Sequence, residues 1–96
     1  MTTFVIFCID KPGHTQVRMD NRPDHLEFLK ASKDMIVTAG PMQSDDGESM
    51  IGSMLVIDVA DRAAAEAFAA ADPYAKAGLF ESTRVMRWKQ VIPAAE

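Results

Sequence analysis

The stretch TFVIFCI, Thr3–Ile9, decides the fold of this 96-residue chain. It is rich in β-branched and aromatic residues, and from Phe4 to Ile9 it is continuously apolar. A strand with one face in water alternates apolar and polar residues, so an unbroken apolar run predicts a central strand that is covered on both faces. Pro12 and Gly13 then form a turn signal that leads into a polar loop.

A helix is predicted downstream of that loop. Pro23 suits the first helical position, where its missing N–H costs nothing, and Asp20 and Asn21 lie just upstream as capping residues. The helix is predicted to run to Lys33 or Asp34. On a helical wheel its apolar sector includes His25, which raises the question of what a titratable ring does there.

The rest of the chain continues with strand and helix patterns. Met35–Met42 and Met50–Val59 are predicted strands joined by a polar hairpin loop, and Gly52 inside the second indicates a bulge or a close backbone approach. Asp61 is predicted to cap an Ala-rich helix over residues 62–71. Asp72-Pro73 stops that helix and starts a short turn, and residues 79–92 are predicted to form the last strand.

This order, β-α-β-β-α-β, predicts an α+β fold of the ferredoxin-like type, with an antiparallel four-stranded sheet and both helices on one face. One domain is expected over residues 1–92, with a loose tail at 93–96. The sheet face without helices would expose more apolar surface than a monomer usually shows. We therefore expect a homodimer that packs these sheet faces together.

Composition excludes several classes of function. The net charge is −4, and no stretch gathers the Lys and Arg residues that phosphate binding needs, so no nucleic-acid partner is expected. The longest apolar run, Phe4 to Ile9, is far shorter than a membrane-spanning helix, and the N-terminus lacks the basic segment of a signal peptide. A single cysteine, Cys8, is interpreted as a small buried hydrophobic residue and suits a reducing cytoplasm.

Few catalytic or cofactor motifs are present. The glycines match no phosphate-binding loop, Ser53 lacks a nucleophile-elbow motif, and the two histidines have no metal-ligand spacing. The acidic residues Asp45, Asp46 and Glu48 are interpreted as a solvated hairpin tip. No metal and no cofactor are therefore indicated, and acid–base chemistry remains.

His25 is the candidate for that chemistry, because its ordinary pKa lies near neutrality. A general base needs an orienting partner, and Asp72 at the helix break is the best carboxylate for this role. Two simpler interpretations stay open at this point: His25 as a hydrogen-bonded core histidine, and Asp72 as a helix cap. Arg22 is either a surface charge or a guanidinium that binds an anionic substrate through two N–H groups. Tyr74 either packs against its neighbours or places its hydroxyl in a cleft.

Several motifs together resemble the YciI-like (YCII-related) family, and they cover about residues 2 to 92. The separation between RPDHL and DPYAKAG is the specific part of the resemblance. The matching segments, in chain order, are DKPG (Asp10–Gly13), Arg18, RPDHL (Arg22–Leu26), AGP (Ala39–Pro41), GS (Gly52-Ser53) and DPYAKAGLF (Asp72–Phe80).

The resemblance implies the dimeric α+β barrel fold and an active site built on a His–Asp pair, which would be His25 and Asp72. Proteins similar to this family include a dehydrochlorinase that acts on a chlorinated hydroxyquinol. The implied function is a cofactor-independent enzyme that moves a proton during elimination or isomerisation of a small organic acid, aromatic-derived acids included. Arg22, Ser53 and Tyr74 would bind the substrate. The alternatives are a non-catalytic ligand-binding or stress-related module and a purely structural dimerisation domain.

Overall fold

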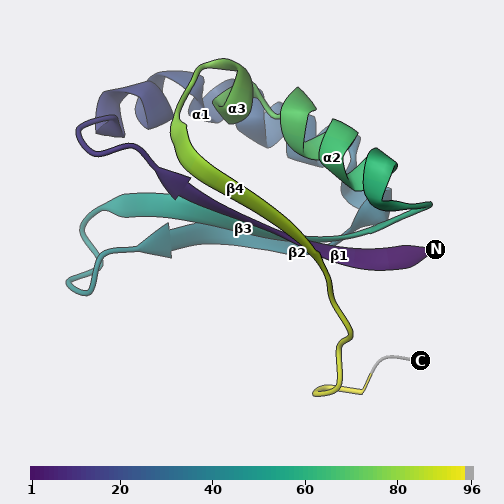
Figure 1. The fold of residues 1–96 in the computed structure, drawn as a ribbon. Coiled ribbons are helices and arrows are strands. Elements are labelled where there is room, and N and C mark those ends of the chain that lie inside the picture. Colours follow the sequence, from purple (N-terminus) through teal and green to yellow (C-terminus); the bar gives the residue numbers. More distant parts are fainter. Residues whose placement is uncertain (95–96) are drawn as a thin grey trace.

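β1 (Thr2–Asp10) lies inside a four-stranded antiparallel sheet with the strand order β2-β3-β1-β4. The computed structural model describes residues 1–94. Figure 1 shows the helices on one face of the sheet, while the segment after β4 leaves from the opposite side. The other elements are α1 (Thr15–Ala31), the 3-10 helix η1 (Lys33–Met35), β2 (Ile36–Gln43), β3 (Met50–Val59), α2 (Arg62–Ala71), α3 (Pro73–Lys76) and β4 (Phe80–Arg87).

The central position predicted for the first strand is confirmed. β1 pairs with β3 on one side and with β4 on the other, so neither of its edges faces solvent. Phe4, Ile6 and Cys8 alternate toward the helices and are at most 2% exposed, which confirms the interpretation of Cys8 as a buried residue. They pack with alternate residues of β3 and with Phe68 of α2 to form the core. The predicted β-α-β-β-α-β order and ferredoxin-like α+β fold are therefore correct.

The predicted start of the first helix is wrong. α1 begins at Thr15, with His14 at the N-cap position, so Pro23 lies inside the helix, and Asp20 and Asn21 are helical residues and not caps. The Asn21 side chain donates instead to the backbone carbonyl of Val17, 2.8 Å away. The first two turns carry no apolar stripe because their buried residue is Arg18. A hydrophobic pattern therefore cannot mark where this helix begins.

Other boundaries follow the local signals more closely. The Asp61 side chain accepts a hydrogen bond from the Ala64 amide at 2.9 Å and caps α2 as predicted. The first helix ends at Ala31, short of the predicted Lys33 or Asp34, because a 3-10 turn takes over. β4 ends at Arg87 and not at residue 92. The Trp88 N–H still donates to the Thr3 carbonyl at 2.9 Å, but β1, the strand that β4 pairs with, begins at Thr2 and is too short to pair with a strand that runs to residue 92.

Gly52 confirms the predicted close backbone approach. A Cβ atom built at this position would lie 2.4 Å from the Cys8 carbonyl oxygen and 2.6 Å from the Met42 methyl carbon, so the strands leave no room for a side chain. Among residues 1–94, none of the helices is long and apolar enough to span a membrane. The predicted tail at 93–96 extends beyond the described residues and stays a prediction.

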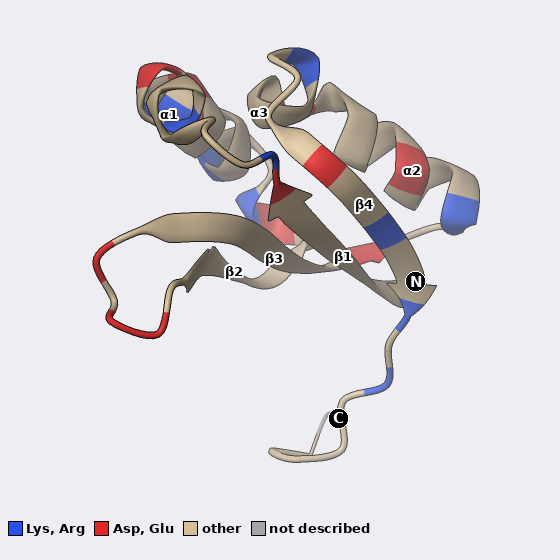
Figure 2. Ribbon diagram, turned by 60° about the vertical axis from the view of Figure 1, so that its left-hand side comes forward, with Lys and Arg blue, Asp and Glu red and all other residues tan. Residues whose placement is uncertain are grey.

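Charge is distributed unevenly over this fold. Figure 2 shows acidic residues gathered on the loop between β2 and β3. Within that loop Asp46 accepts hydrogen bonds from the Ser44 hydroxyl at 2.6 Å and the Glu48 amide at 3.0 Å. These bonds lower the pKa of the Asp46 carboxyl, which is fully exposed. Within the described part of the chain, no group of three His, Cys, Asp or Glu side chains could hold a metal ion.

Candidate active site

A pocket of about 350 Å³ lies between α1 and the β2–β3 side of the sheet. Most of its wall is apolar and comes from Leu, Met, Ala and Pro side chains of α1, β2 and β3. Its polar side chains are Arg18, Arg22, His25, Ser53 and Tyr74. A largely apolar pocket with a few polar groups is the usual form of a small-molecule site.

α1 supplies three of these polar side chains from one face. Arg18, Arg22 and His25 are spaced by four and three residues, so they lie above one another along the helix. Arg18 and His25 are the buried residues of α1. The inward face of α1 therefore carries titratable and cationic groups beside Phe28 and Leu29, which pack against the core.

His25 and Asp72 meet in the structure although 47 residues separate them in the chain. The Nδ1 atom of His25 lies 2.8 Å from Oδ1 of Asp72, and both side chains are at most 10% exposed. The same Asp72 oxygen accepts the backbone N–H of Tyr74 at 2.9 Å, so Asp72 also caps α3. The capping interpretation and the pairing interpretation of Asp72 therefore both hold.

These bonds assign the tautomer of the His25 ring. A carboxylate only accepts hydrogen bonds, so Nδ1 carries the proton and donates it to Asp72. In residues 1–94 no fully buried side-chain nitrogen or oxygen lacks a partner, and no hydrogen bond reaches Nε2 of His25. The Nε2 atom is therefore accessible from the pocket, with its lone pair free to accept a proton.

Tyr74 holds the plane of the His25 ring. The two rings stack with their centroids 4.0 Å apart and an angle of 16° between their planes, and Tyr74 is only 1% exposed. Burial raises the pKa of the Tyr74 phenol, and the nearby Arg18 charge offsets part of that rise. Tyr74 thus keeps its proton at neutral pH, and its proposed contact with a substrate stays a prediction.

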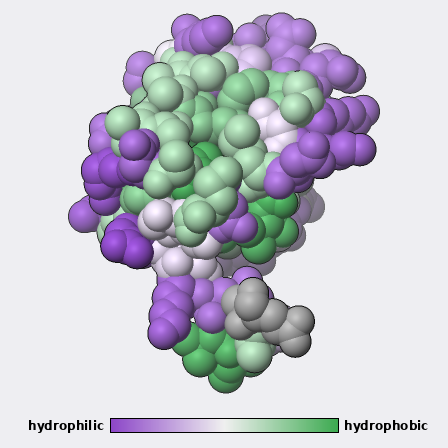
Figure 3. Space-filling view, turned by 90° about the vertical axis from the view of Figure 1, so that its right-hand side faces the viewer, coloured by the Kyte–Doolittle hydropathy of each residue, from purple (hydrophilic) through white to green (hydrophobic). Residues whose placement is uncertain are grey.

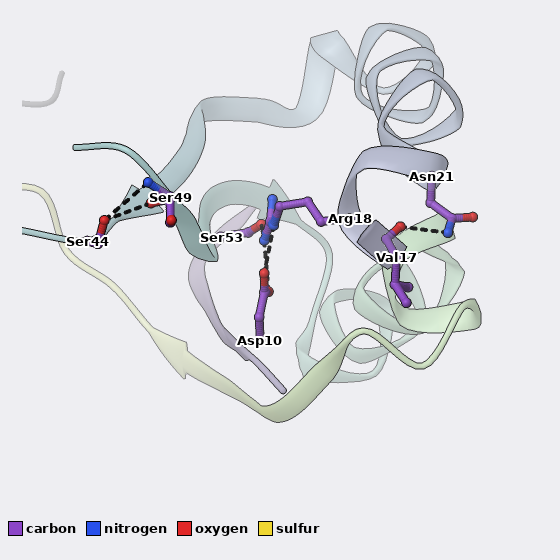
Figure 4. A network of polar contacts seen from close by, with 7 residues as sticks. All are labelled: Asp10, Val17, Arg18, Asn21, Ser44, Ser49 and Ser53. Atoms are coloured by element: carbon purple, nitrogen blue, oxygen red, sulfur yellow. Dashed lines mark hydrogen bonds and ion pairs between the residues drawn. The ribbon is translucent and has the colours of Figure 1, made fainter. Parts of the chain in front are cut away.

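Arg18, Asp10 and Ser53 form a second buried group, which the analysis of the sequence missed. Figure 4 shows Arg18 reaching from α1 to Asp10 on β1 and Ser53 on β3. Its Nε and Nη2 atoms donate to the two Asp10 oxygens at 2.7 and 2.9 Å, and Nη2 also donates to Ser53 Oγ at 3.0 Å. Arg18 had appeared only as one matching residue of the family resemblance. Its spacing from Arg22 and His25 on one helical face was the signal that could have placed it in the site.

The Arg18 guanidinium is held in its charged form. Burial lowers its pKa, but the hydrogen bonds and charge of Asp10 outweigh that effect, and the net pKa is raised. Arg22 differs from it, because Arg22 lies exposed at the pocket and forms no ion pair with a carboxylate in residues 1–94. The predicted helix start at Pro23 placed Arg22 ahead of the helix, whereas in the structure Arg22 lies within α1.

Comparison with known proteins places this chain in a family. Residues 2–89 match the YCII-related domain. The protein YciI of Escherichia coli O6:H1 is 35% identical over 95 residues, which cover 92% of this chain and 97% of that protein. The chain belongs to the YCII-related family. An uncharacterised Haemophilus influenzae protein is 33% identical over the same share of both chains, and the predicted resemblance is confirmed.

Solved structures extend the comparison of this YCII-related protein. The 5-chloro-2-hydroxyhydroquinone dehydrochlorinase (TftG) of Burkholderia phenoliruptrix AC1100, in complex with 2,5-dihydroxybenzoquinone, is 36% identical and has a TM-score of 0.87. The match covers 97% of this chain and 99% of that one. A crystal structure of an antibiotic biosynthesis monooxygenase has a TM-score of 0.55 at 12% identity, a likeness of fold alone.

Proposed function

We propose that this YCII-related protein is an acid–base enzyme in which His25 moves a proton on a small organic molecule, by elimination or isomerisation. The observation that carries the proposal is the 2.8 Å bond to Asp72 from His25, which lines the pocket. It leaves Nε2 without a hydrogen-bond partner in the described part of the chain and open to a molecule in the pocket. The similar dehydrochlorinase structure supports an elimination, since that protein is named for removing hydrogen chloride.

The proton transfer follows from these contacts. Nε2 takes a proton from a carbon or hydroxyl of the substrate, and His25 becomes an imidazolium ion that the Asp72 carboxylate stabilises. In an elimination, the electron pair left behind forms a new double bond while chloride departs, and the proton then passes to water. In an isomerisation, the imidazolium returns the proton to a different substrate atom. Side chains suffice for both reactions, so the proposal includes no cofactor.

The pocket favours a particular kind of substrate. Its volume of about 350 Å³ admits a molecule of the size of one substituted ring, and its apolar walls favour a largely hydrocarbon frame. Arg22, which forms no ion pair within residues 1–94, offers its guanidinium to an anionic substituent, and Ser53 and Tyr74 line the same pocket. These groups fit a small aromatic-derived acid or phenol.

Turnover by a His25→Ala variant tests the proposal. Chloride release from 5-chloro-2-hydroxyhydroquinone, then from a panel of chlorinated phenols and small acids, is measured for wild type and variant. Loss of a general base typically lowers turnover by about 10²- to 10⁴-fold. His14→Ala is the matched control, because His14 precedes α1 and does not line the pocket. Full activity of His25→Ala on a confirmed substrate would contradict the proposal, and binding without turnover by wild type would favour the alternative of a non-catalytic ligand-binding module.

The partner that we propose is a second copy of this chain. Met86 on β4, opposite Val5 in the sheet, lies on the face without helices and is 44% exposed. The segment after β4 projects on the same side and carries Val91 and Ile92, which are 67% and 89% exposed. Figure 3 shows the apolar atoms of this segment standing apart from the body of the molecule. A facing sheet would cover both apolar surfaces.

A further inference from the structure

The guanidinium of Arg18 holds Ser53 in a fixed orientation. Two of its N–H groups bind both oxygens of Asp10, a bidentate arrangement that fixes the plane of the guanidinium. A further N–H on Nη2 points to Ser53 Oγ at 3.0 Å. The side chains of Arg18 and Asp10 are 5% and 8% exposed, so the ion pair is shielded from water. Ser53 itself is 3% exposed.

The hydroxyl proton of Ser53 has no acceptor within residues 1–94. A guanidinium has five donors and no acceptor, so Ser53 Oγ can only accept from Arg18 and must direct its own proton elsewhere. The bond from Arg18 is the side-chain hydrogen bond that Ser53 makes in the described part of the chain. Because Ser53 lines the same pocket as His25, this proton is available to a molecule bound there.

The Arg18 charge makes this hydroxyl a stronger donor. A hydroxyl that accepts from a cation is polarised, and its O–H binds a negatively charged oxygen more strongly than an ordinary serine does. Preorganised donors of this kind stabilise the charge that develops on oxygen during a reaction. Asp10 and Arg18 would act through Ser53 and not on the substrate directly, which makes them positioning residues.

We propose that the Arg18–Asp10 pair fixes the Ser53 hydroxyl as the hydrogen-bond donor to an anionic substrate oxygen, so that the substrate is a phenol or an enolisable ketone. This inference rests on the proposed function of His25. Nε2 removes a proton either from the phenol hydroxyl of the substrate or from the carbon next to its carbonyl. In the first case the electron pair stays on the phenol oxygen as a phenolate, and in the second it moves onto the carbonyl oxygen as an enolate. Ser53 donates its hydrogen bond to this oxygen, while Arg18 keeps its proton throughout.

Binding of a graded series of phenolates tests the proposal without any turnover. Para-substituted phenols that are ionised at the assay pH are titrated into the protein by calorimetry, and affinity is compared with the basicity of the phenolate oxygen. For wild type we expect affinity to rise with basicity, because a more basic oxygen forms a stronger hydrogen bond with Ser53. For Ser53→Ala we expect this dependence to be lost, with binding of the most basic phenolate weakened by about tenfold.

Three variants separate this role from a structural one. Ser53→Thr keeps a hydroxyl and should restore the dependence on basicity. Arg18→Lys keeps a charge but cannot bind Asp10 and Ser53 with a fixed fork, so it should flatten the dependence partly. Ser82→Ala, on β4 and on the sheet face away from the pocket, is the matched control and should behave as wild type.

The results distinguish this proposal from the proposed function. An unchanged dependence in Ser53→Ala, or no phenolate binding by wild type, would overturn the role of Ser53 whatever His25 does. Normal turnover in His25→Ala together with a Ser53-dependent phenolate series would instead overturn the proposed function and leave the oxygen-binding site. Folding of each variant is checked by its circular dichroism spectrum and thermal melt.

Discussion

Replacing Asp72 by asparagine removes one negative charge while it conserves the shape of the site. A single Asp72 oxygen, Oδ1, accepts both the His25 Nδ1–H at 2.8 Å and the Tyr74 N–H at 2.9 Å. The amide oxygen of an asparagine can accept both bonds in the same position. We therefore expect Asp72→Asn to keep the fold, the cap of α3 and the His25 tautomer.

The size of the effect follows from the kind of bond that is lost. A hydrogen bond to a charged group contributes about 1.5–3 kcal/mol and a neutral one about 0.5–1.5 kcal/mol, so the His25 bond weakens by roughly 1–1.5 kcal/mol. Asparagine caps a helix about as well as aspartate, so the Tyr74 bond changes little. When His25 becomes a cation in the transition state, the lost attraction slows turnover by about five- to thirteenfold. The loss should stay smaller than the 10²- to 10⁴-fold expected on removing the base itself.

Two measurements check this prediction. Turnover is compared among wild type, Asp72→Asn and His25→Ala, and the protonated ring nitrogen of His25 is identified by ¹⁵N NMR. His14, whose Nδ1 lies 3.0 Å from the Pro12 carbonyl oxygen, provides an internal reference in the spectrum. Asp61→Asn, which removes the charge from the α2 cap outside the pocket, is the matched control for turnover.

The reasoning is refuted if Asp72→Asn turns over as fast as wild type. A change of tautomer, with the proton on Nε2 of His25, would refute the argument that one oxygen serves both bonds. Such a ring could not act as the base, and turnover would then fall as far as in His25→Ala.

Three further predictions concern stability and assembly. Gly52→Ala should lower the free energy of unfolding by about 1–3 kcal/mol in chemical denaturation, because the new Cβ meets a backbone carbonyl. Gly40→Ala, whose Cβ would have nothing within 4 Å, should change it by less than about 0.5 kcal/mol. Equal losses in the two variants would contradict the close approach at Gly52. Burial raises the pKa of the Cys8 thiol from 9.0 to about 11, so the unfolded chain loses this proton first and the Cys8 contribution to stability should fall between those pH values. In urea unfolding, the stability of Cys8→Ala should lack this part of the fall at alkaline pH. Identical pH profiles of stability for wild type and Cys8→Ala would disprove the role of Cys8. Met86→Lys should raise the dissociation constant of the proposed dimer at least about tenfold in sedimentation experiments. Ala67→Lys, on the exposed side of α2, should leave that constant unchanged. A wild-type protein that sediments as a monomer would exclude the dimer.

Local chemistry made much of the fold predictable. Each strand and the Ala-rich helix carry their own signals, such as the apolar run of β1 and the Asp61 cap, because these act between residues close in sequence. The break at Asp72-Pro73 is equally local, since proline restricts the residue before it. The start of α1 was missed for a physical reason. The buried residue of its first two turns is Arg18, and a search for hydrophobic periodicity interprets such a position as exposed.

The sequence by itself determined which elements form, their order, and the histidine and aspartate that the family resemblance singled out. Only the tertiary structure brought His25 to Asp72 across 47 residues and Arg18 to Ser53 across 35. Buried charged and polar groups are stable only with partners, and a chain can supply those partners from any distance along its sequence. Spacing within one helix can show that such groups share a face, but the packing of α1 against the sheet and α3 decides what they bind.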